Sequence, residues 1–270
     1  MPAAAADVRI DVLGVPVDVL TRDALLARVG EWLSATPPVR ARVVAYLNVH
    51  VLDTALRVPS LARFLREEAD LVYCDGDGIR HAARLLAAAG AGGGALPERM
   101  TGADWIDSLA ARAAREGWRL AWIGGYAGGA EGGTAGRAAR ALRRAHPGLQ
   151  LHAEHGFHVD EDALLERVRA FAPDLVLVGM GTPAQEGFVE RNAATLGARV
   201  VWTVGALAEL VAGDVPRGPR WLHRRQEWLA RLLVNPRRTW RRYTLGNARV
   251  AGRIARAIAR GAHARGDSTE

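Results

Sequence analysis

The feature that most constrains the fold is a regular alternation of short apolar runs with longer amphipathic segments. Such alternation is typical of a mostly parallel sheet covered by helices on both faces, and we predict a Rossmann-like α/β fold. The apolar runs predict strands at Val8–Val17 (a strand or a hairpin), Val43–Leu47, Leu71–Cys74, Leu120–Ile123, Leu149–Ala153, Leu175–Val178 and Val200–Val204. The amphipathic segments predict helices at Asp23–Ser34, Asp53–Leu65 (interrupted by Pro59), Ile79–Ala89, Asp104–Glu116, Glu131–Ala145, Glu161–Phe171 and Gly187–Leu196.

The pattern changes after Gly213, where prolines punctuate Arg-rich helical segments. From Arg217 to Arg265 there are fourteen arginines and one acid, Glu227, a net charge of +13. Since the whole chain carries +7, the remainder carries about −6 (7 − 13). We therefore predict an α/β catalytic domain over residues 1–213 and a basic helical appendage over residues 214–270, with a polyanionic partner for the appendage.

The basic appendage has two interpretations. Arginines on a helix can form a solvated surface or a nucleic-acid arm, or the segment can lie on anionic lipid. Tryptophans interleaved with the arginines at helical spacing favour the membrane surface, which we assign to residues 217–260. The chain has one cysteine, no signal-peptide pattern and no run of ~20 apolar residues, so we expect a cytoplasmic protein that is peripheral to the membrane.

Polar residues follow several of the predicted strands, and ligands bind at this end of open α/β sheets. Gln185 and Glu186 stand side by side in Gly181-Thr-Pro-Ala-Gln-Glu, after the strand at Leu175. Asp75 and Asp77 follow the strand at Leu71 and suit a general base or a metal ligand. Asp77 has an alternative role as the cap of the next helix, so Asp75 is the stronger catalytic candidate.

Three further strand ends carry candidates. Gly124 and Gly125 open a turn before a helix, where backbone amides favour phosphate, although the spacing is not Gly-x-Gly-x-x-Gly. Glu154 either imitates the ribose-binding acid of a dinucleotide fold or is a solvated strand terminus. Asn48 could hydrogen-bond a uracil or a sugar, whereas His50 is typical of a structural histidine. No Cys/His/carboxylate cluster surrounds His155 and His158 at zinc spacing, so we predict no metal site.

Taken in order, these features resemble the WecG/TagA/CpsF family of glycosyltransferases, from about Val8 to Tyr243. The matching stretches are Leu13-Gly-Val-Pro-Val-Asp18, Asn48, Asp75-Gly76-x-Gly78, Arg99-Met-Thr-Gly-Ala-Asp104, Ile123-Gly124-Gly125, His146-Pro-Gly-Leu149, Gly156-Phe157, Gly181-x-Pro183-x-Gln185-Glu186, Val204-Gly205-Ala206, Arg217-x-Pro219, Glu227-Trp228-x-x-Arg231-Leu232, Pro236-x-Arg238 and Arg242-Tyr243.

The resemblance implies an inverting transfer of a sugar from a UDP-sugar to a polyprenyl-diphosphate-linked saccharide, without a metal or another cofactor. It implies that Asp75 is the base. It implies substrate contacts by Asn48, Arg99 and Gln185. Glu209 stands at the position of a family aspartate. Arginines of the appendage, which we map to Arg231, Arg238 and Arg241, are implied to close over the diphosphate. The products in this family are teichoic acid linkage units, enterobacterial common antigen or exopolysaccharide repeats.

Some positions depart from the family pattern. Tyr46 stands where a threonine is usual, and Ala184 replaces a lysine beside Gln185. Tyr46 and Glu209 should both border the sugar, so the donor stays open between UDP-N-acetylmannosamine, its uronic acid and UDP-glucose. The missing lysine predicts that phosphate neutralisation depends more heavily on the appendage.

Two other functions remain as alternatives. An NAD(P)-dependent oxidoreductase would use the same architecture, but the Gly-x-Gly-x-x-Gly turn is absent and the chain has no lysine. A nucleic-acid-binding module would use the Arg-rich tail but would leave Asp75, Gln185 and Glu186 without a role, so we expect no nucleic-acid partner. Self-association into a homo-oligomer is left open.

Overall fold

The computed structural model describes residues 8–36, 38–127, 133–157, 160–214 and 236–266, with side chains in the last range from Thr244 to Arg260. Its centre is a six-stranded parallel sheet of order β4-β3-β8-β7-β5-β6. The strands are β3 (Arg42–Leu47), β4 (Leu71–Cys74), β5 (Arg119–Gly124), β6 (Gln150–Glu154), β7 (Leu175–Gly179) and β8 (Val200–Thr203). The predicted Rossmann-like α/β fold is confirmed.

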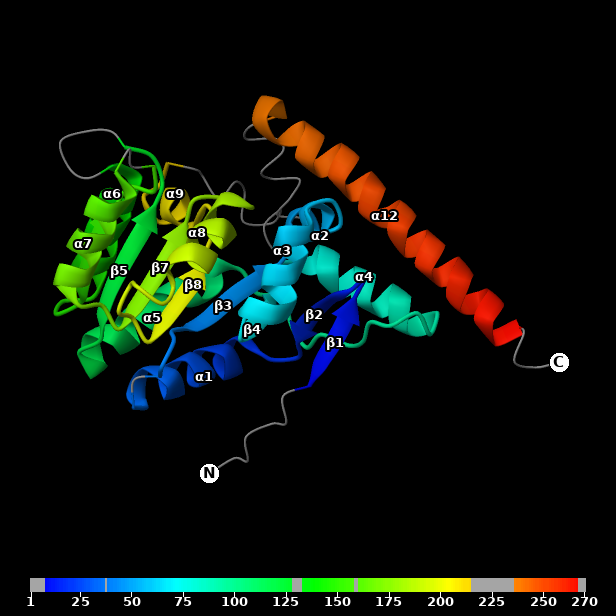
Figure 1. Ribbon diagram of the computed structural model, residues 1–270, viewed down its shortest axis with the longest axis horizontal. Helices are drawn as coiled ribbons and strands as arrows, with labels where there is room; N and C mark the ends of the chain where they lie inside the picture. The colour runs from blue at the N-terminus through cyan, green and yellow to red at the C-terminus, as the bar shows by residue number, and fades with distance from the viewer. Residues whose placement is uncertain (1–7, 37, 128–132, 158–159, 215–235, 267–270) are drawn as a thin grey trace.

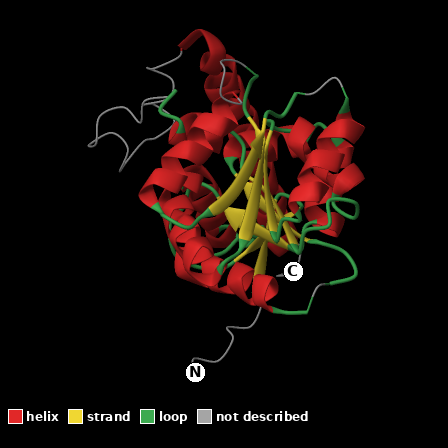
Figure 2. Ribbon diagram, turned by 90° about the vertical axis from the view of Figure 1, so that its left-hand side faces the viewer, coloured by secondary structure: helices red, strands yellow, loops and turns green. Residues whose placement is uncertain are grey.

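Helices cover both faces of this sheet (Figure 2). One series of contacting helices is α1 (Arg22–Ser34), α5 (Gly102–Glu116), α9 (Leu207–Val211) and α6 (Gly133–Ala145). The other is α2 (Val49–Ala55), α3 (Pro59–Arg63), the π-helix η1 (Phe64–Glu68) and α8 (Ala184–Asn192). α4 (Asp77–Ala88) lies beyond β4, and α7 (Glu161–Phe171) precedes β7.

Most strands of the sheet are apolar because both of their faces are buried, whereas the edge strand β6 carries Gln150, His152 and Glu154. Every residue of β4, β7 and β8 is buried. Trp202 of β8 stacks on Trp105 of α5 with ring centroids 4.1 Å apart, which fixes the packing of that helix against the sheet. Aromatic contacts of this kind stabilise by about 0.5–1.5 kcal/mol beyond their buried area.

The predicted N-terminal hairpin is formed by β1 (Arg9–Val12) and β2 (Val15–Asp18), which pair antiparallel. Leu13 and Gly14 in its turn both have positive φ, 55° and 85°, as a two-residue type I′ turn requires. The buried carboxylate of Asp18 accepts a hydrogen bond from the Val72 amide at 2.7 Å. This bond attaches the hairpin to the edge of the parallel sheet.

The helix predicted at Asp53–Leu65 is wrong in its extent. Three short helical segments occupy this region, because Pro59 begins α3 and cannot continue α2. α2 also begins earlier than expected, at Val49, because the side chain of Asn48 accepts a hydrogen bond from the Val51 amide at 3.0 Å. The capping side chain therefore stands at the end of β3.

The longest helix is α12 (Pro236–Gly266), which packs on α2 and α4 (Figure 1). Arg249 donates two hydrogen bonds to Asp53 of α2, at 2.8 and 2.6 Å. Burial acts to raise the pKa of Asp53, but hydrogen bonds and charges from Arg249 and Arg57 outweigh it and hold the pKa below its ordinary value. Val250 is buried beside this pair. The C-terminal helix is thus seated on the α/β unit by a polar and an apolar contact.

Candidate functional site

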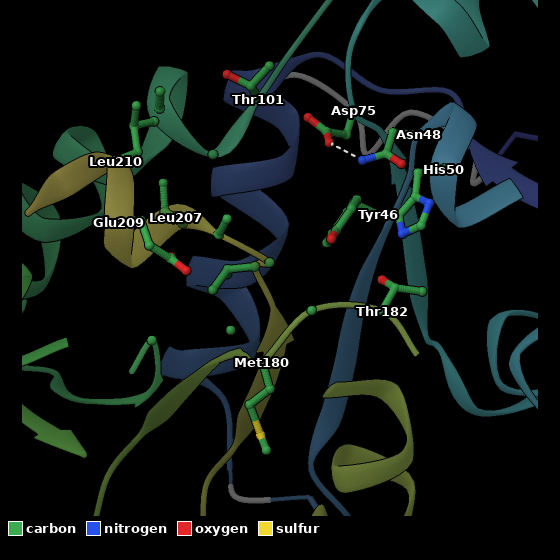
Figure 3. Close-up of a pocket in the computed structure, with 18 of the residues that line it drawn as sticks. Tyr46, Asn48, His50, Asp75, Thr101, Met180, Thr182, Leu207, Glu209 and Leu210 are labelled. Atoms are coloured by element: carbon green, nitrogen blue, oxygen red, sulfur yellow. Dashed lines mark hydrogen bonds between the residues drawn. The ribbon is translucent and has the colours of Figure 1, made fainter. Parts of the chain in front are cut away.

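A pocket opens over the carboxyl ends of the parallel strands, where an open α/β sheet binds ligands (Figure 3). Its lining comes from the exits of β3, β4, β5, β6, β7 and β8, from the start of α5 and from α9. The side-chain donors and acceptors on it are those of Tyr46, Asn48, His50, Tyr73, Asp75, Thr101, Tyr126, Thr182 and Glu209.

Asp75 and Asn48 form the polar side of this pocket. The Asn48 side-chain amide donates to Asp75 Oδ2 at 2.8 Å, and its carbonyl oxygen caps α2 (Figure 3). The backbone of Asp75 continues the parallel pairing, since its amide donates to Leu47 at 2.9 Å. The Asp75 carboxylate is therefore held between two strand ends, with Asn48 setting its direction. The structure brings these two predicted residues together.

The neighbouring carboxylate, Asp77, has a different environment. The N-cap of α4 is Gly76, with φ of 86°, and Asp77 is the first residue inside the helix. Its carboxylate accepts a hydrogen bond from Arg80 at 2.8 Å. Asp77 is thus an acid of the first helical turn, which the helix dipole favours, rather than the cap itself.

Glycines form the opposite side of the pocket, and we call Gly125, Gly179 and Gly205 the glycine floor. A Cβ on Gly179 would lie 2.4 Å from the carbonyl oxygen of Gly205, and one on Gly125 would lie 2.5 Å from Thr134. Gly124 lies directly beneath, where a Cβ would approach the Gly179 oxygen to 2.6 Å. The Gly125 amide donates to Gly179 at 3.1 Å, so this glycine contributes space to the pocket while its N–H serves the sheet.

Gln185 and Glu186 lie beneath this floor. Gln185 is 0% exposed; its amide nitrogen donates to Glu186 Oε1 at 2.8 Å and to the Tyr46 hydroxyl at 3.3 Å. Its carbonyl oxygen accepts from the Gly205 amide at 3.0 Å. Burial raises the pKa of Glu186 to about 7, although hydrogen bonds from Gln185 and Thr182 act in the opposite direction. The second oxygen of Glu186 is buried without a hydrogen-bond partner among the described residues.

Of the two predicted substrate contacts Glu209 and Arg99, only Glu209 lines the pocket. Glu209 lies on α9 and lines the pocket opposite the Asp75–Asn48 pair (Figure 3). Arg99 precedes the capping box at Thr101 and Asp104, and its guanidinium lies 3.4 Å from the Asp104 carboxylate. Among the described residues, the pocket lining includes Glu209 but not Arg99.

The appendage carries three predicted substrate contacts, Arg231, Arg238 and Arg241. Arg231 lies outside the described residues. Arg238 and Arg241 lie in α12, of which the structure describes only the backbone at these positions.

Glu154, the candidate for a ribose-binding acid, accepts a hydrogen bond from Arg167 at 2.8 Å and lies 3.1 Å from His152. Its carboxylate is therefore paired with neighbouring side chains at the end of β6.

Two aromatic side chains at the rim escaped the sequence-based prediction. Tyr126 and Phe157 each expose 49% of their surface and stack on one another at 5.5 Å, with an angle of 17° between the rings. Both follow a strand, β5 and β6, and this position after a strand is the signal that could have indicated them. The pocket thus combines a carboxylate and an amide, a glycine floor and an aromatic rim. Among the described residues, no three His, Cys, Asp or Glu side chains gather to hold a metal ion.

The model of the family described as "Glycosyl transferase WecG/TagA/CpsF family" matches residues 10–264. This span includes all strands of the six-stranded sheet, the pocket and most of α12, so the match extends over the sheet and the C-terminal helix.

Curated relatives agree with the family match. A protein of Bacillus spizizenii W23, named N-acetylglucosaminyldiphosphoundecaprenol N-acetyl-beta-D-mannosaminyltransferase, is 28% identical over 176 residues, 64% of each chain. That match spans just under two thirds of the relative's length. Proteins of the same name from Staphylococcus aureus strains MRSA252 and NCTC 8325 are 23% identical over 235 residues, 86% of this chain and 87% of theirs.

Proposed function

We propose that this chain, which belongs to the WecG/TagA/CpsF family of glycosyl transferases, moves a sugar from a UDP-sugar to a polyprenyl-diphosphate-linked saccharide in cell-surface polysaccharide biosynthesis. The observation that carries the proposal is the Asn48–Asp75 pair at the mouth of a strand-end pocket, with a bond of 2.8 Å. The names of the relatives support an acceptor of the N-acetylglucosaminyl-diphosphoundecaprenol class and an N-acetylmannosamine-type sugar.

The proposed reaction is a single displacement that inverts the anomeric carbon. A hydroxyl of the acceptor sugar loses its proton to the Asp75 carboxylate as its oxygen bonds to the anomeric carbon. The bond from that carbon to the phosphate oxygen breaks at the same time, and UDP leaves with the electron pair. The Asn48 amide holds one Asp75 oxygen and so orients the carboxylate that accepts the proton. General-base assistance of this kind is typically worth ~10²–10⁴-fold in rate.

The leaving diphosphate needs positive charge, and the glycine floor supplies none. We assign that role to Arg231, Arg238 and Arg241 of the appendage, since charge-assisted hydrogen bonds from arginine suit phosphate oxygens. The seating of α12 on α2 through Arg249 supports this, because it attaches the arginine-bearing segment to the helix that Asn48 caps. Asn48, Glu209 and Gly125 are proposed to hold the donor, with Arg99 at the edge of the site.

The appendage is also proposed to hold the protein on the inner, cytoplasmic face of the membrane. Arg253, Arg256 and Arg260 are exposed on α12, and anionic lipid attracts such side chains at about 1 kcal/mol each. Within the described ranges, no helix is both long and apolar enough to span a bilayer. Flotation with anionic and neutral vesicles tests the contact: replacing these three arginines by glutamine should reduce binding to anionic vesicles only. Equal binding of the variant and the unaltered chain would refute it.

A UDP-release assay tests the function. UDP-N-acetylmannosamine, its uronic acid and UDP-glucose are each offered with a synthetic prenyl-diphosphate-linked N-acetylglucosamine, with and without the acceptor. We expect acceptor-dependent UDP release with one donor and a product of inverted anomeric configuration. Release that is absent for every donor would reject the proposal. The oxidoreductase alternative is not supported by the family, and nicotinamide absorbance would reveal it.

A further inference from the structure

Gln185 was expected to touch the substrate, but the structure gives its side chain no open face. It is 0% exposed, and both the amide nitrogen and the carbonyl oxygen already have partners inside the protein. A group placed in this way affects a ligand only through the residues that it holds. Its partners are the Tyr46 hydroxyl, at the exit of β3, and the Gly205 amide, at the exit of β8.

The Tyr46 hydroxyl is fixed against the glycine floor. The side chain is 8% exposed, yet it lines the pocket. A Cβ on Gly205, whose φ is 57°, would lie 2.6 Å from this hydroxyl oxygen, so the hydroxyl rests directly on the backbone there. Tyr73 supports the ring from the next strand, with ring centroids 6.2 Å apart. The hydroxyl therefore has a defined position that does not depend on a ligand.

Tyr46 lines the same pocket as Asn48 and Asp75, the groups proposed to take part in the reaction. Figure 3 places it between the Asn48–Asp75 pair and Thr182, facing the interior of the pocket. In the proposed reaction, a sugar whose anomeric carbon is attacked by the hydroxyl that Asp75 deprotonates would lie over this part of the floor. The glycine floor beside it is backbone, which recognises shape more than it recognises a particular hydroxyl or acetamido group, whereas Thr182 and Glu209 line other parts of the pocket.

We propose that Tyr46 is the residue that selects the donor sugar, through a hydrogen bond from its hydroxyl to the hexose, and that Gln185 is a positioning residue that acts through Tyr46 and Gly205. The inference rests on the proposed glycosyl transfer and names the part of the site that reads the sugar. A site built to hydrogen-bond a substrate hydroxyl discriminates strongly against an analogue that lacks it, because the buried partner is then unpaired.

The test begins with Tyr46→Phe, which keeps the ring and removes only the hydroxyl. We expect kcat/KM for the preferred UDP-hexose to fall about tenfold, the effect of one hydrogen bond. The ratio of kcat/KM between preferred and disfavoured donors should shrink by a similar factor, whereas the affinity for UDP alone should be unchanged. An unchanged ratio between donors would overturn the assignment of Tyr46.

The second part is a double-mutant cycle with Gln185→Met, which conserves length but removes the amide. If Gln185 acts through Tyr46, the double variant loses several-fold less activity than the product of the two single losses. If the two losses multiply, Gln185 does not act through Tyr46, which would overturn that positioning role. Gln150→Leu, at an exposed position at the start of β6, is the matched control and should have no effect.

Thermal unfolding monitors the fold of each variant. Should Gln185→Met not fold, Tyr46→Phe and Tyr46→Thr across the donor panel still decide the role of Tyr46. Absence of transfer by the unaltered chain with every donor would reject the proposed function itself. Transfer by the unaltered chain, with unaltered donor ratios in the Tyr46 variants, would reject this inference alone.

Discussion

The two sides of the pocket are built in opposite ways. At the exits of β3 and β4, side chains make the site: the Asn48 amide holds the Asp75 carboxylate at 2.8 Å. At the exits of β5, β7 and β8, the floor of the site is backbone, because a Cβ on Gly125, Gly179 or Gly205 would collide with neighbouring protein atoms. The comparison teaches that one side supplies chemistry and the other supplies space for a large ligand.

The largest expected effect comes from a substitution of Asp75, on the side of the pocket that supplies chemistry. Asp75→Asn should lower kcat by ~10²–10⁴-fold, the usual contribution of a general base, while the Kd for UDP stays near that of the unaltered chain. Single-turnover UDP release and UDP binding by calorimetry measure the two quantities. Asp77→Asn, one helical position inside α4, is the control and should retain transfer. Substantial turnover by Asp75→Asn would remove Asp75 from the role of base.

The next effect breaks the side that supplies space. Gly124→Ala would place a Cβ 2.6 Å from the Gly179 oxygen, so β5 and β7 must separate. Overpacking of this kind costs about 1–3 kcal/mol of stability, and the pocket should also bind UDP more weakly. Chemical denaturation and calorimetry measure both. Gly252→Ala is the control, because nothing lies within 4 Å of its Cβ and the helix favours alanine. Unchanged stability and UDP affinity in Gly124→Ala would contradict the close packing.

The pH dependence of stability tests the environment of Glu186, which lies beneath the glycine floor. The pKa of Glu186 is raised to about 7 by burial, so the folded chain keeps a proton that the unfolded chain has already released. Between the unfolded pKa of 4.5 and about 7, stability should therefore fall as pH rises, by at most about 1.4 kcal/mol per pH unit. Denaturation from pH 5 to 8 should show this slope, and Glu186→Gln should flatten it. An identical slope in both proteins would assign the pH dependence to other groups.

The smallest effect tests whether the side that supplies chemistry depends on the C-terminal helix. Arg249→Gln removes the bonds to Asp53 of α2, whose first residue follows the cap Asn48. We expect a modest fall in the unfolding midpoint and a lower kcat with little change in the KM for the donor. Arg256→Gln changes the same charge at an exposed position of α12 and, in assays without lipid vesicles, should alter neither. Equal behaviour of the two variants would separate α12 from the site.

Much of the fold could be predicted from residue patterns alone. Most strands are short apolar runs because both of their faces are buried. The predicted strand positions agree with the structure to within about one residue, and β1 and β2 form the two strands of the predicted hairpin. Helix extents were harder to predict, since the three segments after Asn48 and the short α9 depend on local capping and on Pro59.

The candidate site could be predicted only as a set of strand ends. Asn48 and Asp75 follow neighbouring strands of a parallel sheet, so their proximity follows from topology. Gln185 follows a strand in the same way, yet it is buried, because its side chain points into the contact between three strand exits. Sequence position assigns a residue to the end of a strand, but not to its inner or outer side.

The sequence by itself determined the class of fold, the family and the choice of Asp75 as the candidate general base, because these depend on local pattern and on residue identity. The tertiary structure decided which polar groups reach the pocket: Tyr46 and Glu209 line it, and Gln185 lies beneath it. It also decided that α12 is seated on α2 through Arg249 and Asp53. The physical reason is that exposure and pairing depend on contacts between distant segments, such as 53 with 249 or 46 with 185.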